Sequence, residues 1–71
     1  MLKNGEYGTR AEDFAVGQRV ELSPACDLWM MGARFGTVRK IVNGRVCVKM
    51  DNPRVRKLQW MAPAYLCARS L

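Results

Sequence analysis

The side chains that could do chemistry in this sequence are three cysteines and six carboxylates, because histidine is absent. Cys26, Cys47 and Cys67 form no Cys-x-x-Cys pair, so their spacing lacks the close ligand pairs of structural zinc sites. A cysteine nucleophile would need a neighbouring base, usually histidine, and the carboxylates form no recognisable acid–base pair. We therefore expect no catalytic residue, no metal and no cofactor. We expect the cysteines to be small buried hydrophobic groups in a reducing compartment.

Basic residues carry the strongest functional signal. The chain has 12 Lys and Arg against 6 Asp and Glu, a net charge of +6. Before Gly32 there are three basic and five acidic side chains. From Gly32 onward there are nine basic side chains and one acidic side chain, Asp51. A cationic segment of this kind attracts polyanions, although the charges also fit an ordinary solvated surface. We predict a surface that binds DNA or RNA, formed by Arg34, Arg39, Lys49, Arg54, Arg56 and Lys57.

An apolar run in the longest loop supports a second hypothesis. The run is Leu28, Trp29, Met30 and Met31. Methionine and tryptophan suit adaptable contact surfaces, so the run predicts a protein–protein contact or self-association. The same residues would instead cover an open end of the domain if the loop folds back onto the core. Both hypotheses describe a binding module and not an enzyme.

Aromatic side chains have two interpretations. Trp29, Phe35 or Tyr65 could stack on bases beside the basic residues. A domain of 71 residues has few side chains with which to form a core, however, so we expect Phe35 and Trp60 to be buried.

Five short segments have the alternation or β-branched content of strands. We predict them at Val16–Leu22, Phe35–Ile41, Arg45–Met50, Val55–Trp60 and Leu66–Ala68. Ser23-Pro24 ends the first, and the long loop that follows has room for a helical turn. A second helical turn is expected at Met61–Tyr65, before the last strand. The chain is therefore expected to be all-β, with a domain over residues 14–71.

The segment before this domain is polar, and we predict a flexible tail over residues 1–13. Thr9 and Glu12 have the spacing of a capping box, which predicts one helical turn over Arg10–Phe14.

Asn43-Gly44 is the strongest hairpin signal in the chain. A two-residue turn would pair Val38 with Lys49 and mix apolar and charged residues on one face. A three-residue turn pairs Val38 with Val48 and gathers the valines, although it also turns Lys40 toward them. We favour the three-residue turn.

The strand order, the long first loop and the helical turn before the last strand resemble an SH3-like barrel of the KOW type. The residues that carry the resemblance are Val16-Gly17-x-x-Val20, Gly32 with Gly36-Thr37-Val38, Val46-x-Val48 and Pro63-x-x-Leu66. The chain is also similar to short SH3-like proteins of bacteriophages and prophages, in which Ser-Pro-Ala leads to a Trp and then a Gly. Ser23, Pro24, Ala25, Trp29 and Gly32 match that order. The resemblance implies a five-stranded barrel, a phage or prophage origin, and phage assembly as one form of the protein-contact hypothesis.

The sequence shows no signal peptide and no apolar run of about 18 residues. We therefore expect a cytoplasmic protein, in the host cytoplasm if it is phage-encoded, that has no membrane partner.

Overall fold

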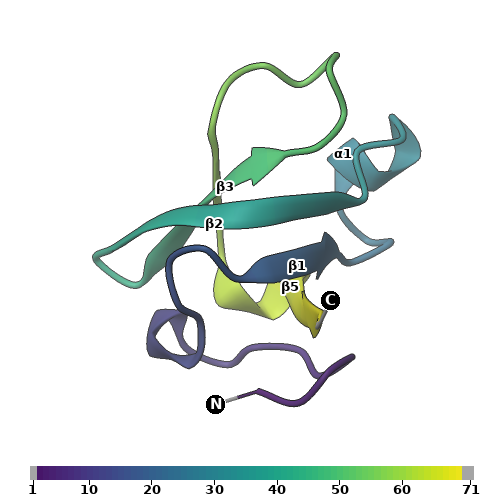
Figure 1. Ribbon diagram of the computed structural model, residues 1–71. Coiled ribbons are helices and arrows are strands. Elements are labelled where there is room, and N and C mark those ends of the chain that lie inside the picture. The colour runs from purple at the N-terminus through teal and green to yellow at the C-terminus, as the bar shows by residue number, and fades with distance from the viewer. Residues whose placement is uncertain (1, 70–71) are drawn as a thin grey trace.

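The computed structural model describes residues 2–69, in which five strands form one antiparallel sheet in the order β4-β3-β2-β1-β5 (Figure 1). The strands are β1 (Arg19–Leu22), β2 (Phe35–Val42), β3 (Arg45–Met50), β4 (Gln59–Met61) and β5 (Leu66–Arg69). The predicted all-β, five-stranded architecture is confirmed. The edge strands β4 and β5 do not pair with each other among the described residues, so the sheet is open and the predicted barrel is not established.

The core lies on one side of the sheet, toward which every second residue of β1 and β3 points. Val20 and Leu22 of β1 share this side with Val38 of β2 and Leu66 of β5, and all four are at most 1% exposed. Fully burying each such side chain contributes about 1.5–3 kcal/mol. The charged and aromatic residues between them therefore face away from the core.

The β2–β3 hairpin combines features of both expected registers. Asn43 and Gly44 have φ values of 50° and 77°, so they form a two-residue turn of the I′ kind, with Val42 paired to Arg45. The favoured three-residue turn is therefore wrong. Val38 still pairs with Val48, because the register shifts between Val38 and Lys40 at a β-bulge.

Two strands are shorter than predicted. The first begins at Arg19 and not at Val16, because Gly17 (φ 92°) lies in a turn that the Gln18 N–H closes onto the Ala15 carbonyl at 3.1 Å. The fourth covers Gln59–Met61, because residues 51–58, which include Asn52-Pro53, form a loop.

Three single turns complete the fold: η1 (Ala11–Asp13), α1 (Asp27–Met30) and η2 (Pro63–Tyr65). The helical turns expected in the long loop and before the last strand are confirmed as α1 and η2. Figure 1 shows α1 and the β3–β4 loop in the upper part of the molecule and η1 at the bottom.

The cap of η1 differs from the prediction. Asp13, and not Glu12, closes the turn: its carboxylate accepts hydrogen bonds from the N–H groups of Thr9 and Arg10 at 2.9 and 3.0 Å. The turn itself covers three residues, so the expected span of Arg10–Phe14 is too long.

Part of the segment before η1 runs beside β5. The Gly5 N–H donates to the Ala68 carbonyl at 2.6 Å, and the Gly8 N–H donates to the Leu66 carbonyl at 3.1 Å. Tyr7 also forms an isolated antiparallel bridge with Cys67. These bonds join residues 5–8 to the outer edge of β5, and the buried Ala11 extends the core ahead of residue 14.

Candidate nucleic-acid interface

Four of the six basic residues predicted to bind nucleic acid lie around the β3–β4 loop. Arg54, Arg56 and Lys57 belong to the loop. Lys49, near the end of β3, reaches it, because its Nζ donates a hydrogen bond to the Arg56 carbonyl oxygen at 3.4 Å. The buried Val55 anchors the loop in the core, so its charged neighbours are held at the surface. We call Lys49, Arg54, Arg56 and Lys57 the loop cluster.

The other two predicted residues do not join this cluster. Arg34 directly precedes β2, and its guanidinium carbon lies 3.9 Å from the ring centroid of Trp29, a cation–π contact. Arg34 also borders the start of the loop, in a hollow that it lines with Asn52 and Pro53. Arg39 is the bulge residue of β2 and is exposed. The structure thus gathers five of the six residues near the loop and leaves Arg39 in the middle of a strand.

Four residues that the sequence analysis did not select for binding lie on the strands next to the loop cluster. Lys40, Cys47 and Trp60 pair in one row across β2, β3 and β4, and paired residues project to the same side of a sheet. Val46, which directly precedes Cys47 on β3, is fully buried in the core, so Cys47 and its row face outward. Arg45 lies two residues before Cys47 and therefore faces outward as well. We call the side chains of Lys40, Arg45, Lys49 and Trp60 the outer face.

The bulge explains the orientation of Lys40. With Val38 paired to Val48, a regular ladder would have turned Lys40 toward the core. The extra residue at Arg39 reverses the alternation, so Lys40 lies opposite Cys47 on the outer face.

No ion pair involves the loop cluster or the outer face within residues 2–69. The ion pairs there join Arg19 to Asp51 and Arg69 to Glu21. Hydrogen bonds from the Arg19 guanidinium lower the pKa of Asp51, so this carboxylate stays charged and stays with Arg19. The cations of the loop cluster and the outer face are therefore available to phosphates.

Phe35 and Trp60 are not buried as predicted. Their exposed fractions are 42% and 48%, because both occupy outward positions of the sheet. Phe35 pairs with Glu21, whereas Trp60 pairs with Cys47 beside the cations of the outer face. Trp60 is thus the exposed ring that lies on a cationic strand surface.

The apolar run of the first long loop is divided between core and surface. Leu28 and Trp29 are partly buried and pack against the core cluster, whereas Met30 and Met31 are 79% and 60% exposed. Half of the run therefore covers the core, and the other half is available for contact.

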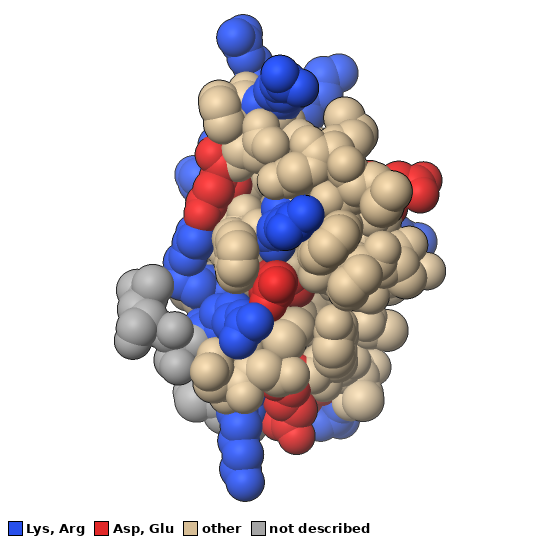
Figure 2. All heavy atoms as spheres, turned by 90° about the vertical axis from the view of Figure 1, so that its right-hand side faces the viewer, with Lys and Arg blue, Asp and Glu red and all other residues tan. Residues whose placement is uncertain are grey.

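The apolar run and the loop cluster meet along one groove of about 390 Å³. It is lined by Leu28, Met31, Arg54, Val55, Arg56, Lys57 and Gln59. Figure 2 shows this side of the molecule, with Lys and Arg side chains at the top, where the loop lies, and uncharged residues below them between further charged side chains. The groove therefore offers a ligand both cationic and apolar contacts.

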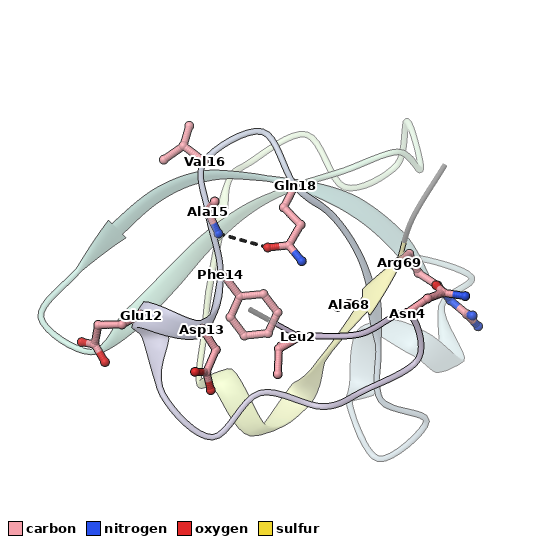
Figure 3. A pocket seen from close by; sticks show the side chains of 10 residues that line it. All are labelled: Leu2, Asn4, Glu12, Asp13, Phe14, Ala15, Val16, Gln18, Ala68 and Arg69. Atoms are coloured by element: carbon pink, nitrogen blue, oxygen red, sulfur yellow. Dashed lines mark hydrogen bonds between the residues drawn. The ribbon is translucent and has the colours of Figure 1, made fainter.

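A larger cavity, of about 500 Å³, lies at the opposite end of the molecule beside η1 (Figure 3). Three of its polar side chains form interactions within the protein. The Gln18 Oε1 accepts a hydrogen bond from the Ala15 N–H at 3.0 Å. Asp13 caps η1, and Arg69 forms an ion pair with Glu21. The rest of the lining is largely apolar, as Figure 3 shows for the Phe14 ring. The cavity therefore has room for a ligand, but Asp13, Gln18 and Arg69 in its lining are already engaged.

The cysteines are free thiols in the structure. Cys47 and Cys67 are buried and Cys26 is partly buried. Burial raises the pKa of the Cys67 thiol, which disfavours the reactive thiolate. Within residues 2–69, no group of three or more His, Cys, Asp or Glu side chains could hold a metal ion.

No protein-family model, no curated protein and no solved structure matches the chain. None of the helices in the described part of the chain is both long enough and apolar enough to cross a bilayer.

Proposed function

We propose that the protein is a non-catalytic module that binds nucleic acid through the loop cluster and the outer face. One observation carries the proposal: a set of basic side chains without carboxylate partners in residues 2–69 runs from the strand surface into one loop. The set is Lys40, Arg45, Lys49, Arg54, Arg56 and Lys57.

The spacing of these cations suits a phosphate chain. Arg45 and Lys49 lie on the same side of β3, four residues apart, which corresponds to about 13 Å along a strand. The hydrogen bond from Lys49 to Arg56 continues this line into the loop. A bound strand would release counterions along the whole line, and this release supplies sequence-independent affinity.

We also propose that the open sheet belongs to an SH3-like barrel of the KOW type and that the chain is of phage or prophage origin. The sheet order, the long β1–β2 connection and the η2 turn before β5 support this assignment. The free thiols and a nucleic-acid ligand are consistent with a cytoplasmic setting.

The proposal is tested by titrating fluorescently labelled single-stranded and duplex oligonucleotides of about 16 nucleotides at low ionic strength. The double variant Arg54→Ala/Arg56→Ala should weaken binding roughly tenfold, because two phosphate contacts are lost. The matched control is Lys3→Ala/Arg10→Ala, which removes the same charge from the segment beyond β5, and it should bind like the parent. Absence of binding by the parent, or equal losses in both variants, would contradict the proposal.

The exposure of Met30 and Met31 favours a second candidate function, a protein contact or self-association. Light scattering after size exclusion tests self-association. Met30→Ser/Met31→Ser should convert any oligomer to monomer, whereas Val16→Ser, which alters another exposed apolar residue, should not. A parent that is monomeric at high concentration would remove self-association from consideration.

A further inference from the structure

The outer face exposes an indole where a folded protein would usually bury one. Trp60 is 48% exposed on β4, a strand of three residues at the edge of the sheet. Its neighbours along the strand, Gln59 and Met61, are half-buried and buried, so only the Trp60 side chain projects outward. Tryptophan is a large hydrophobic group that most often finds a packing partner, so an exposed one on a strand beside unpaired cations points to a ligand.

Cations flank this indole at strand spacing. Lys40 and Trp60 lie at the two ends of the row that Cys47 links, so two strand spacings, about 10 Å, separate their backbones. Arg45 lies two residues before Cys47 on β3, on the same side of the sheet. Cys47 is only 1% exposed although it faces outward, so the neighbouring side chains close over it and leave no hole in the surface.

A hollow adjoins the indole. Its volume is about 370 Å³, and Trp60, Arg45 and Tyr65 contribute to its lining. Tyr65, at the end of η2, is 45% exposed and provides a second ring. Asp27 of α1 also lines the hollow. Its carboxylate repels phosphate but accepts hydrogen bonds from the amino groups of bases, so it favours a base inside the hollow and the phosphates outside it.

We infer that the nucleic acid bound under the proposed function is single-stranded, and that one base stacks on Trp60 while Lys40 and Arg45 contact the adjacent phosphates. The reason is geometric. In a duplex, the faces of the bases are covered by their neighbours in the stack, so an exposed ring on a protein surface has nothing to stack on. In a single strand the faces are open, and stacking on an aromatic side chain tolerates any base.

The inference rests on the proposed function, and its experiment separates the two. Anisotropy titrations compare one labelled strand of mixed sequence with its blunt duplex, using the full chain. The parent should bind the single strand more tightly than the duplex. Trp60→Ala should lose about tenfold in single-strand affinity and little in duplex affinity, because a stacked base is lost and the phosphate contacts remain. Trp60→Phe should recover most of that loss.

Phe35→Ala is the matched control. It removes another exposed aromatic ring from the outward side of the sheet, but that ring lies in the row of Glu21 and not in the row of Lys40 and Trp60. Phe35→Ala should bind both oligonucleotides like the parent. Thermal unfolding monitored by circular dichroism verifies that each variant is folded before it is titrated.

A spectroscopic readout tests the contact directly. The single strand should quench the indole fluorescence of the parent. The quenching should disappear in Trp60→Phe, whose remaining indole is Trp29.

The outcomes that overturn the inference differ from those that overturn the function. If the parent binds and Trp60→Ala matches Phe35→Ala, or if the duplex binds as tightly as the single strand, the base-stacking inference is wrong and the proposed function stands. If Trp60→Ala loses self-association and keeps its oligonucleotide affinity, Trp60 belongs to a protein contact and the inference is again wrong. If the parent binds no oligonucleotide at low ionic strength, both fail.

Discussion

At the scale of single residues, hydrogen bonds to carboxylates decide which acidic groups stabilise the fold. The Asp13 carboxylate accepts the N–H groups of Thr9 and Arg10 and also the Thr9 hydroxyl at 3.1 Å, and the backbone bonds lower its pKa. Glu12 has the predicted spacing but is exposed. Sequence position alone could not show that Asp13 caps the turn in place of Glu12, because both side chains are acidic and lie in the same short turn.

The lowered pKa predicts how stability depends on pH. Since the folded-state pKa of Asp13 is below its unfolded value of about 3.9, its contribution is complete above that value and is lost as the pH falls through the folded-state pKa. Hydrogen bonds from Arg19 also lower the pKa of Asp51, so the contribution of Asp51 to stability is likewise lost as the pH falls. Asp13→Asn should therefore lower the melting temperature at pH 7 and flatten its decline between about pH 5 and pH 2. Glu12→Gln should leave the melting temperature at pH 7 close to that of the parent, and an equal loss in both variants would count against the assigned cap.

The exposure of Trp60 is the residue-scale feature that the sequence could not supply. A strand residue faces the core or the solvent according to its pairing. The pattern around Trp60 placed the fourth strand at Val55–Trp60, whereas the observed strand covers Gln59–Met61. Hydrophobicity then favoured burial. Only the pairing of Trp60 with Cys47 sets the ring on the outward side.

At the scale of elements, local signals predicted well and pairing did not. The Asn43-Gly44 turn, the five strands and the η2 turn at Pro63 are readable because each depends on a few adjacent residues. The bulge at Arg39 is not readable, since it resolves a conflict between the turn and the partner strand. It places Lys40 on the outer face, so the absence of Lys40 from the predicted site follows from the missing bulge.

The hairpin turn yields a prediction at this scale. Gly44 has a φ of 77°, and a Cβ built there would meet nothing within 4 Å, so substitution costs backbone strain without a clash. Gly44→Ala should lower the free energy of unfolding by about 1–2 kcal/mol in chemical denaturation. Asn43→Gly should change it by less than about 0.5 kcal/mol, because glycine tolerates the positive φ that Asn43 already has. Equal stability of Gly44→Ala and the parent would disprove the I′ turn.

At the scale of the whole molecule, the sheet order places most of the unpaired cations and three of the acidic side chains toward opposite edges. β2, β3 and the β3–β4 loop carry most of the described cations without carboxylate partners, whereas residues 5–8 extend the opposite edge beyond β5. That distant segment and η1 contain Glu6, Glu12 and Asp13. The uneven charge along the sequence thus becomes an uneven charge in space. Such a field orients a polyanion toward the outer face before contact.

The charge separation predicts which cations set the salt dependence of binding. For a single strand, the logarithm of the association constant falls with the logarithm of salt concentration with a slope of about −0.7 for each phosphate neutralised. Arg45→Gln removes one outer-face cation and should make the slope shallower by about 0.7 in titrations between about 50 and 200 mM salt. Arg10→Gln removes the same charge near η1 and should leave the slope unchanged, because that end of the molecule does not meet the strand. Equal slopes for both variants would mean that net charge alone drives binding and that the outer face is not the interface.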